Sequence, residues 1–180
     1  MREYKILFTG TVGAGKTTAI GCVSDVPPVM TDVRNSDTSI AKERTTVGLD
    51  FGELTLDNGD RVRMFGTPGQ ERFAFLWKIL VRNALGLVVL IDNSRPDPLA
   101  DLALYMTGFS EALRTIPCAI GVGRMETHPV PSLDDYAQAI AGTGRVFPIL
   151  SVDVRNRSDV ILLLDTLLMQ LEADLGGENE

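Results

Sequence analysis

The stretch Gly10–Thr17 constrains this chain more than any other, because it matches the pattern GxxxxGK[ST]. An apolar run before it, Tyr4–Thr9, predicts a buried strand, and the residues from about Gly15 onward predict a helix. In a turn between a strand and a helix, glycines let successive backbone N–H groups converge on phosphate oxygens, and the helix N-terminus adds a partial positive charge. The motif therefore predicts a site for a nucleoside triphosphate or diphosphate.

Each residue type in this motif has a chemical reason. We expect Lys16 to contact the β- and γ-phosphates, and the Thr17 hydroxyl to bind Mg²⁺. The nucleotide-binding residues expected here are Gly13, Ala14, Gly15, Lys16, Thr17 and Thr18.

Short apolar runs alternate with amphipathic stretches along the whole chain, which predicts an α/β fold with a mostly parallel sheet and helices on both faces. Asn58-Gly59 favours a type I′ hairpin turn, so the strands on either side of it should pair antiparallel at one edge of the sheet. Six strands are expected, over Tyr4–Thr9, Leu49–Leu56, Arg61–Phe65, Leu85–Ile91, Cys118–Val122 and Val146–Leu150.

Between these strands, apolar residues recur at helical spacing. A capping box is expected at Ser132, and the segment Ser24–Thr45 is long enough to be functional or mobile. The apolar faces are expected to comprise Phe73, Leu76, Ile79 and Leu80, then Leu99, Leu102, Ala103, Met106 and Leu113, and finally Val160, Leu164, Leu167, Leu168, Leu171 and Leu175.

Composition narrows the class of partner. The 180 residues include 17 basic and 24 acidic side chains, a net charge of −7 that argues against nucleic acid or an anionic membrane surface as the partner. Two distant cysteines suggest neither a disulfide framework nor a zinc site, and no apolar run approaches the ~18–20 residues of a membrane span. We expect one cytoplasmic domain, 1–180, without a membrane anchor of its own.

Two further segments resemble a known family. Thr45–Phe51, TTVGLDF, is similar to the TIGxDF stretch at the switch I border of Ras and Rab GTPases, and Thr67–Phe73, TPGQERF, is similar to their switch II sequence TAGQERF. Both lie in the family's order around the Asn58-Gly59 turn. The resemblance covers nearly the whole chain in element order and implies a Ras-like G domain of the P-loop NTPase class, with switch I about 24–46 and switch II about 66–76.

The resemblance also implies roles for residues in the switches. Thr46 would join Thr17 in binding Mg²⁺ when a γ-phosphate is present, Gly69 would offer its N–H to that phosphate, and Gln70 would orient the attacking water. Arg44 is a candidate arginine finger supplied in cis; Arg34 and Arg72 are alternatives, and an ordinary solvated arginine is an open reading for each.

The chain departs from the family at two positions. Gly66 stands where Ras-like proteins carry the Walker-B aspartate, which predicts weaker Mg²⁺ binding. Where the base-reading motif NKxD is expected, the chain has Gly123–Glu126, GRME. Glu126 can accept hydrogen bonds from guanine N1–H and N2–H₂, whereas adenine has no donor at N1, and a surface glutamate is the equally good alternative. The other base-contacting residues expected are Arg124, Ser151 and Val152.

Pro68, the glycine at 66 and the proline-containing switch I resemble a bacterial branch of the family more closely than the eukaryotic ones. This branch contains gliding-motility polarity GTPases and the conservon GTPases encoded beside roadblock-type proteins. By analogy, the expected partner is a roadblock-type or GTPase-activating regulator at the switch surface.

The function expected from the sequence is a Mg²⁺-dependent GTP/GDP switch and slow GTP hydrolase stimulated by a partner. The alternative is a nucleotide-binding interaction module without efficient turnover or strict guanine specificity. A nucleotide kinase is a third possibility, but it would need an arginine-bearing lid insertion that the sequence does not show.

Overall fold

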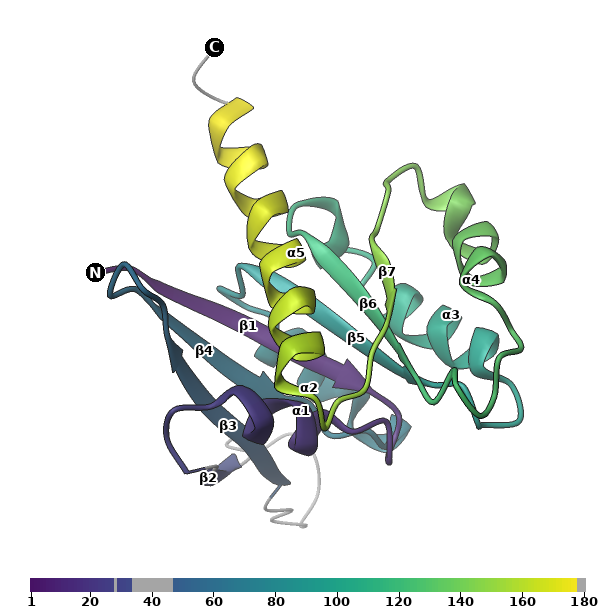
Figure 1. The fold of residues 1–180 in the computed structure, drawn as a ribbon, viewed down its shortest axis with the longest axis horizontal. Helices are drawn as coiled ribbons and strands as arrows, with labels where there is room; N and C mark the ends of the chain where they lie inside the picture. The colour runs from purple at the N-terminus through teal and green to yellow at the C-terminus, as the bar shows by residue number, and fades with distance from the viewer. Residues whose placement is uncertain (28, 34–46, 178–180) are drawn as a thin grey trace.

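Strands that are far apart in the sequence form one sheet in the order β2-β3-β4-β1-β5-β6-β7 (Figure 1). The structure is a computed structural model, and it describes residues 1–27, 29–33 and 47–177. The strands are β1 Glu3–Gly10, β2 Val29–Val33, β3 Val47–Thr55, β4 Arg61–Gly66, β5 Gly86–Asp92, β6 Cys118–Gly123 and β7 Ile149–Ser151. The predicted α/β class, with a mostly parallel sheet and one antiparallel edge, is confirmed.

All six predicted strands are present, and β3 and β4 form the expected antiparallel hairpin. The sheet has a seventh strand, β2, which pairs antiparallel with β3 and lies inside the segment that we expected to be a connection. The last strand also begins later than predicted, at Ile149, because Val146 is exposed and Phe147 packs into the core.

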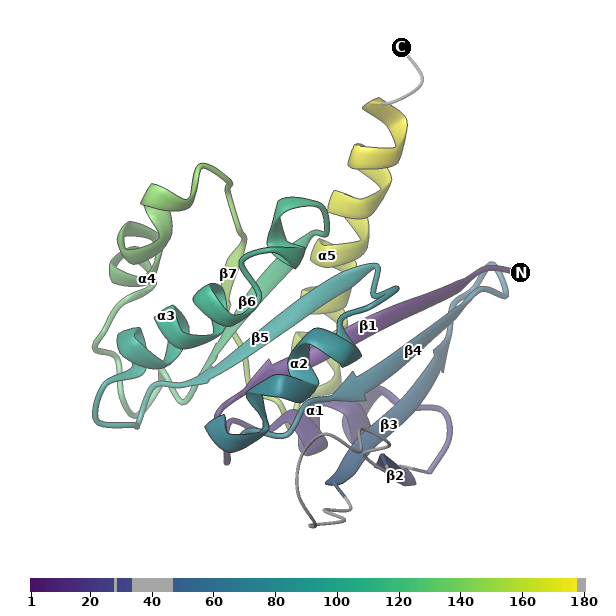
Figure 2. The ribbon, with the colours of Figure 1, turned by 180° about the vertical axis from the view of Figure 1, so that it is seen from behind.

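Helices cover both faces of the sheet, as predicted (Figures 1 and 2). They are α1 Lys16–Val23, α2 Ala74–Leu80, α3 Pro98–Gly108, α4 Leu133–Ile140 and α5 Arg157–Gly177, with short 3-10 turns η1 Glu71–Phe73, η2 Ala112–Arg114 and η3 Ala141–Thr143. The first core cluster joins α1 and α5 to one face, and the second joins α2, α3 and α4 to the other. Burial of these apolar faces is the main favourable contribution to folding.

Two predicted core positions are wrong. Ile79 is half exposed, and Trp77 takes its place by stacking on Phe109 beneath α2. Ala103 is also exposed, because Tyr105 occupies the inward face of α3. Both errors come from assuming which face of a short amphipathic helix points inward, since large aromatic side chains decided the orientation.

One other local prediction is confirmed. The Ser132 hydroxyl accepts from the Asp135 N–H, and the Asp135 carboxylate accepts from the Ser132 N–H, which is the capping box that begins α4.

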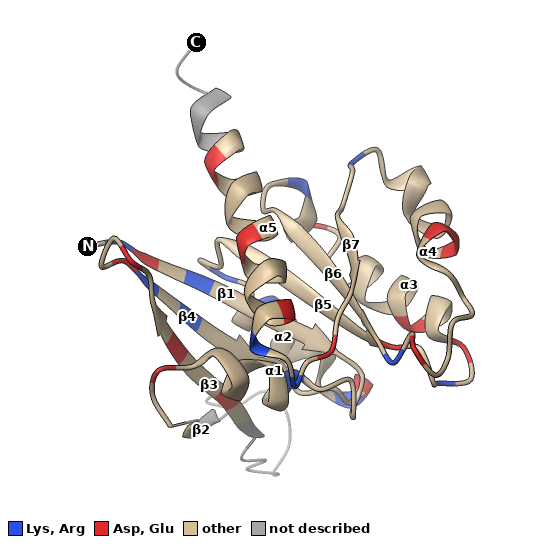
Figure 3. Ribbon diagram, in the orientation of Figure 1, with Lys and Arg blue, Asp and Glu red and all other residues tan. Residues whose placement is uncertain are grey.

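Acidic and basic residues are mixed over the elements (Figure 3). Within the described ranges, no helix is long and apolar enough to cross a membrane.

The topology fixes where a ligand can bind. Strands β1, β4, β5, β6 and β7 are parallel to one another, so their carboxyl ends meet at one edge of the sheet. In open α/β sheets, ligands bind at this edge. The phosphate loop follows β1, switch II follows β4, and the two loops expected to contact a base follow β6 and β7.

Candidate functional site

The phosphate loop between β1 and α1 has the geometry that the motif predicts. Gly15 has φ 93°, a left-handed conformation that favours glycine, and it lies against Val154, whose γ-carbon would be 2.7 Å from a Cβ at this position. The Lys16 ammonium folds back over the loop and donates to the carbonyl oxygens of Gly10 at 2.6 Å and Thr11 at 2.9 Å. The loop therefore holds its cation in the concavity where a phosphate would bind.

Lys16 is 8% exposed, although it is charged. Burial lowers the pKa of its ammonium to about 8, while the nearby Asp50 carboxylate acts in the opposite direction. A buried cation of this kind is stabilised when an anion replaces the water it has lost. The buried ammonium therefore favours an anionic ligand at the phosphate loop.

A cavity of about 460 Å³ opens beside this loop. The phosphate loop and the start of α1 form one wall, and the loops after β5, β6 and β7 form the others. The cavity is lined by Gly13, Ala14, Gly15, Thr18, Ile91, Asp92, Gly123, Arg124, Met125, Glu126, Thr127, Ser151, Val152, Asp153, Val154, Arg155 and Asp159. Its volume is in the range of a small-molecule site.

The structure brings together most of the predicted nucleotide-binding residues. Gly13, Ala14, Gly15 and Thr18 line the cavity on the phosphate-loop side, and Arg124, Glu126, Ser151 and Val152 line it on the opposite side. Lys16 and Thr17 lie beyond the phosphate-loop wall, at the start of α1. Thr46, Arg44 and Arg34 lie outside the described residues.

The loop after β6 is anchored at its first residues. Arg124 has φ 64°, and its guanidinium donates to the Asp92 carboxylate and, at 3.0 Å, to the Ser94 hydroxyl. Burial of Asp92 favours its neutral form, but the hydrogen bonds from Ser94 and the charge of Arg124 hold the pKa of Asp92 below its ordinary value. Arg124 and Asp92 both line the cavity, so this ion pair forms part of its wall.

The loop after β7 carries a second ion pair at the cavity. The Arg155 guanidinium donates to both oxygens of Asp153, at 2.9 and 2.8 Å, and these hydrogen bonds lower the pKa of Asp153 to about 2. Glu126, on the facing loop, is exposed. Carboxylates on two loops therefore face the space between them, so a ligand with several N–H donors would find acceptors there.

Ser151 and Val152 were predicted to contact the base, but the N–H group that is free for such a contact lies further along the chain. The Val152 side chain is buried in the core, and its N–H donates to the Val122 carbonyl at 3.0 Å, so this group is not available to a ligand. The N–H groups of Asp153 and Arg155 are also used. Within the described residues, Val154 is the loop residue whose N–H has no partner. The end of β7, one residue later than predicted, was the signal that was missed.

Asn93 is a second residue that sequence reasoning missed. Its side chain is buried, and its amide nitrogen donates to the carbonyl oxygens of His128 at 2.6 Å and Pro131 at 3.0 Å. Its amide oxygen accepts from the Tyr136 hydroxyl at 2.6 Å. One buried amide thus ties the base loop to β5 and α4, and no local motif marks it.

The predicted switch II segment lies against the phosphate loop. A Cβ on Gly69 would come within 2.6 Å of the Val12 nitrogen, so only glycine permits this approach of two backbones. The Tyr105 hydroxyl donates to the Gly69 carbonyl at 3.3 Å, and the Trp77 indole donates to the Pro68 carbonyl at 3.3 Å. Gly69 is therefore placed where it could meet a terminal phosphate.

The two polar residues after Gly69 point outward. Gln70 is exposed at the start of η1, with no side-chain cap hydrogen bond. Arg72 is also exposed, and its guanidinium lies over the Phe73 ring at 4.7 Å. Neither residue lines the cavity in this arrangement.

The Thr17 hydroxyl, the expected Mg²⁺ ligand, donates to Asp50 Oδ2 at 2.5 Å. Hydroxyl and carboxylate oxygens are the hard donors that Mg²⁺ prefers, so these residues fit that ion. Among the described residues there is no group of three or more His, Cys, Asp or Glu side chains that could hold a metal. Sites for Mg²⁺ with nucleotides need only one or two carboxylates, because phosphates and waters complete the shell.

No family model matches the chain. Individual proteins are similar to it in sequence. ADP-ribosylation factor-related protein 1 of Homo sapiens is 29% identical over 142 residues, which are 77% of this chain and 68% of that protein. Ras-related protein RABE1d of Arabidopsis thaliana is 22% identical over 175 residues, 85% of this chain and 76% of that protein. Ras-related protein Rab-12 of Mus musculus is 28% identical over 107 residues, 58% of this chain and 40% of that protein.

These relatives are small GTPases of the Arf-related and Rab groups. The phosphate loop, the sheet and the helices on its two faces agree with that relationship. The chain therefore has the Ras-like P-loop GTPase fold and is similar in sequence, at low identity, to Arf-related and Rab proteins.

Proposed function

We propose that this protein is a molecular switch that binds GTP and GDP with Mg²⁺ and hydrolyses GTP slowly until a partner stimulates it. The observation that carries the proposal is the cavity, which joins the phosphate loop to two loops able to contact a base. A nucleotide has its phosphates and its base at opposite ends, so such a cavity matches both. The similarity to Arf-related and Rab small GTPases supports the same reading.

The phosphates would be bound by the first wall of the cavity. Their oxygens would replace the carbonyls of Gly10 and Thr11 as partners of the Lys16 ammonium, and N–H groups of the loop would supply further donors. Mg²⁺, when bound, neutralises charge on the β- and γ-phosphate oxygens. In this proposal Thr17 holds the ion from α1, and Thr46 is the second ligand.

The base would be bound by the other walls. The Val154 N–H has no partner among the described residues and can donate to guanine O6, while Glu126 can accept from guanine N1–H and N2–H₂. Adenine presents an acceptor at N1 and a donor at position 6, so both contacts would be mismatched. Guanine preference therefore rests on one N–H group and one carboxylate.

Hydrolysis would depend on switch II. Gly69 is already beside Val12 and can offer its N–H to the γ-phosphate, and Gln70 is the residue proposed to orient water. Gln70 must turn inward from its exposed position to do so. That requirement accounts for slow turnover by the protein alone and for a stimulating partner.

A second function remains open, a nucleotide-binding interaction module without efficient turnover. The observation that favours it is Gly123, which provides no side chain at the position of the family's asparagine. A weakly discriminating base site would still let the protein change its surface on nucleotide binding. It would not require Gln70.

Calorimetric titration of the nucleotide-free protein with GTP, GDP, ATP and ADP in Mg²⁺ tests the proposal, with released phosphate followed in the same samples. We expect tighter binding of GTP and GDP than of ATP and ADP, with slow phosphate release from GTP. The Lys16→Ala variant should bind none of them, because the phosphates lose their buried cation. Equal binding of all four nucleotides, or binding without turnover, would favour the interaction module.

The partner is proposed to be a roadblock-type or GTPase-activating regulator that recognises the switch surface, as in the bacterial branch that the sequence resembles. Co-purification with and without a non-hydrolysable GTP analogue tests this, and indifference to the nucleotide would argue against a switch. We also propose that residues 1–180 form a single G domain in the cytoplasm. The two cysteines are free thiols, which fits that compartment.

A further inference from the structure

The antiparallel hairpin places a carboxylate opposite Gly66. Strands β3 and β4 pair with Phe51 opposite Phe65, and continuing this register by one residue sets Asp50 opposite Gly66. Residues opposite each other in an antiparallel pair project their side chains from the same face of the sheet. Asp50 therefore projects over the site where a side chain at position 66 would lie.

The space at Gly66 is already taken by this aspartate. A Cβ built on Gly66 would lie 3.1 Å from both Cβ and Oδ2 of Asp50, and 3.4 Å from Cδ1 of Ile20. Two side chains cannot share this site without a shift of one of them. Glycine at position 66 is thus what allows the carboxylate to come from the neighbouring strand.

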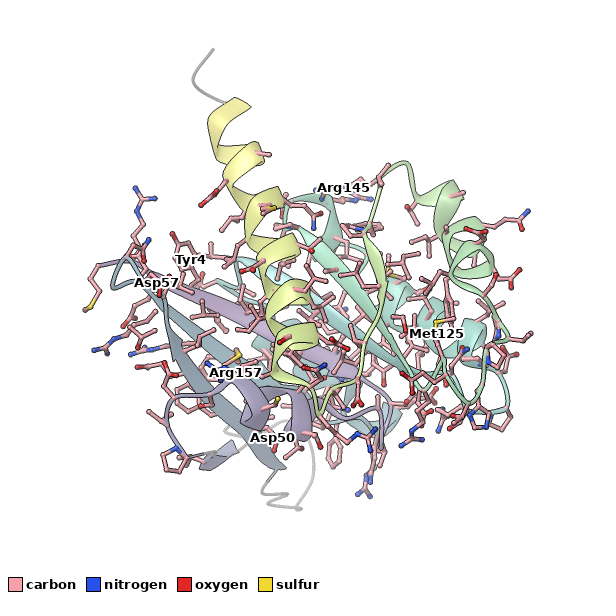
Figure 4. The ribbon with its side chains drawn as sticks, viewed as in Figure 1. Tyr4, Asp50, Asp57, Met125, Arg145 and Arg157 are labelled. Carbon is pink, nitrogen blue, oxygen red and sulfur yellow. The ribbon has the colours of Figure 1, made fainter. Side chains whose placement is uncertain are left out.

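The same carboxylate contacts the phosphate-loop machinery. Asp50 Oδ2 accepts from the Thr17 hydroxyl at 2.5 Å, and its charge acts on the buried Lys16 ammonium. Asp50 lies in the half of β3 that is far from the hairpin turn, whereas Asp57 lies at the turn (Figure 4). An acid on β3 thus reaches the residue on which the proposed Mg²⁺ site is built.

We propose that Asp50 supplies the carboxylate that Gly66 lacks, and that it holds Mg²⁺, directly or through a bound water, together with Thr17. This inference rests on the proposed nucleotide-binding function. It replaces the expectation from the sequence that Mg²⁺ binding is weakened at this strand end. In this proposal the acid stands on β3 instead of β4, and the facing position on β4 is glycine.

The inference is tested on protein loaded with a fluorescent GDP analogue. The rate of nucleotide release is measured against free Mg²⁺, and the midpoint of that curve reports the affinity for the ion. Asp50→Asn should move the midpoint to about 10- to 100-fold higher Mg²⁺, the usual cost of removing a residue that orients a metal's shell. The release rate in excess chelator is measured for each variant as the ion-free reference, so that the midpoint reports binding of the ion and not a general change in nucleotide affinity.

A matched control uses an acid at the other end of the same hairpin. Asp57 is exposed beside the turn, and Asp57→Asn changes the net charge by the same amount without touching Thr17. We expect its Mg²⁺ midpoint to equal that of the wild type. Paramagnetic resonance of Mn²⁺ added to each GDP-loaded variant gives a second reading of the site that does not depend on nucleotide release.

Exchanging the two residues tests the position directly. Asp50→Gly combined with Gly66→Asp moves the carboxylate back to β4 and removes the steric conflict, so Mg²⁺ affinity should return toward the wild-type value. Asp50→Gly alone should have the same Mg²⁺ midpoint as Asp50→Asn. A larger change in Asp50→Gly would come from the glycine in the strand and not from the loss of the acid.

The outcomes distinguish the two proposals. If the wild-type protein binds no guanine nucleotide, the proposed function is wrong. If it binds GDP but Asp50→Asn leaves both the Mg²⁺ midpoint and the Mn²⁺ spectrum unchanged, the inference about Asp50 is overturned and the proposed function stands.

Discussion

At the scale of single residues, the protein concentrates its unusual electrostatics around Lys16. This ammonium is almost fully buried, and its partners in the described structure are two backbone carbonyl oxygens. Carbonyl dipoles compensate a charge less completely than phosphate does. The Lys16 ammonium therefore favours a phosphate over these carbonyl oxygens as its partner.

The lowered pKa of Lys16, about 8, gives a pH dependence with a definite sign. Above this value the nucleotide-free protein loses the charge, and phosphate binding must then restore a proton. We expect the affinity for GDP to fall about tenfold between pH 7 and pH 9, with proton uptake visible as a buffer-dependent binding enthalpy. Equal affinities at the two pH values would show that the charge is not used.

The stability of the nucleotide-free protein should change in the opposite direction. In the unfolded chain Lys16 returns toward its ordinary pKa of 10.5, so the unfolded state binds more protons than the folded state between about pH 8 and 10.5. This residue therefore disfavours folding below that window, and its cost declines as the pH rises through it. Denaturant titrations at several pH values would separate the two effects.

Gln70 has a role in the proposal that its variant can isolate. We expect Gln70→Leu to reduce GTP hydrolysis at least tenfold and to leave GDP affinity unchanged, because the side chain is exposed and does not line the cavity. Single-turnover phosphate release and calorimetry measure the two quantities. Hydrolysis at the wild-type rate would remove Gln70 from the mechanism.

A side chain added at Gly123 is expected to strengthen GDP binding. A Cβ there would meet only the carbonyl oxygens of Ile91 at 3.6 Å and Val152 at 3.7 Å, which is ordinary contact, so a side chain fits. We expect Gly123→Asn to tighten GDP binding about three- to tenfold, the contribution of one added hydrogen bond. Gly123→Ala, which adds carbon but no amide, is the matched control, and equal effects of the two would contradict the explanation.

At the scale of elements, the loop that carries Glu126 is positioned by hydrogen bonds from other elements. Residues 124–131 follow β6 and are held by the side chain of Asn93, which follows β5 and itself accepts from the Tyr136 hydroxyl on α4. All three hydrogen bonds of the Asn93 side chain are buried or half-buried. Elements from two βα units thus share the positioning of the loop that carries Glu126.

Removing this tether should affect both stability and base binding. Asn93→Ala is expected to destabilise the fold by about 1–3 kcal/mol, because the buried Tyr136 hydroxyl loses its acceptor. It should also weaken GDP binding more than pyrophosphate binding, since the phosphate loop is untouched. Tyr136→Phe is the partner variant in a double-mutant cycle of thermal unfolding; additive effects of the two changes would show that the groups are not coupled.

At the scale of the whole molecule, the cavity joins parts of the chain that are distant in sequence. Its walls come from the first βα unit and from the loops after β5, β6 and β7. The elements around the cavity pack into both core clusters, one on each face of the sheet. A ligand in the cavity would therefore contact elements that belong to both clusters. Nucleotide binding should therefore stabilise the fold as a unit.

The size of that stabilisation follows from mass action. At a GDP concentration one hundred times the dissociation constant, the free energy of unfolding should rise by about 2.7 kcal/mol. For a chain of this length that corresponds to an increase in Tm of about 5–10 °C by scanning calorimetry. Lys16→Ala should show no increase, and a rise of the same size in that variant would mean that GDP binds elsewhere.

The sequence by itself determined the features that are encoded locally. The spacing in Gly10–Thr17 predicts a phosphate loop because the backbone of a few consecutive residues forms the site. The turn at Asn58-Gly59 predicts the hairpin for the same reason, and the capping residue Ser132 predicts the start of α4. Alternation of apolar runs with amphipathic stretches was enough for the α/β class, because each element buries its own apolar face.

Only the tertiary structure decided the relations between residues on different strands. Asp50 and Gly66 form one site because the hairpin register sets them opposite each other, and the gap of sixteen positions in the sequence carries no sign of it. The loop after β7 begins later than predicted, because strand pairing and not local composition sets where β7 ends. Asn93 was missed because a buried amide that accepts and donates across three elements has no local pattern. Neighbouring residues determine local backbone geometry, whereas packing between strands depends on residues that come together only when the chain folds.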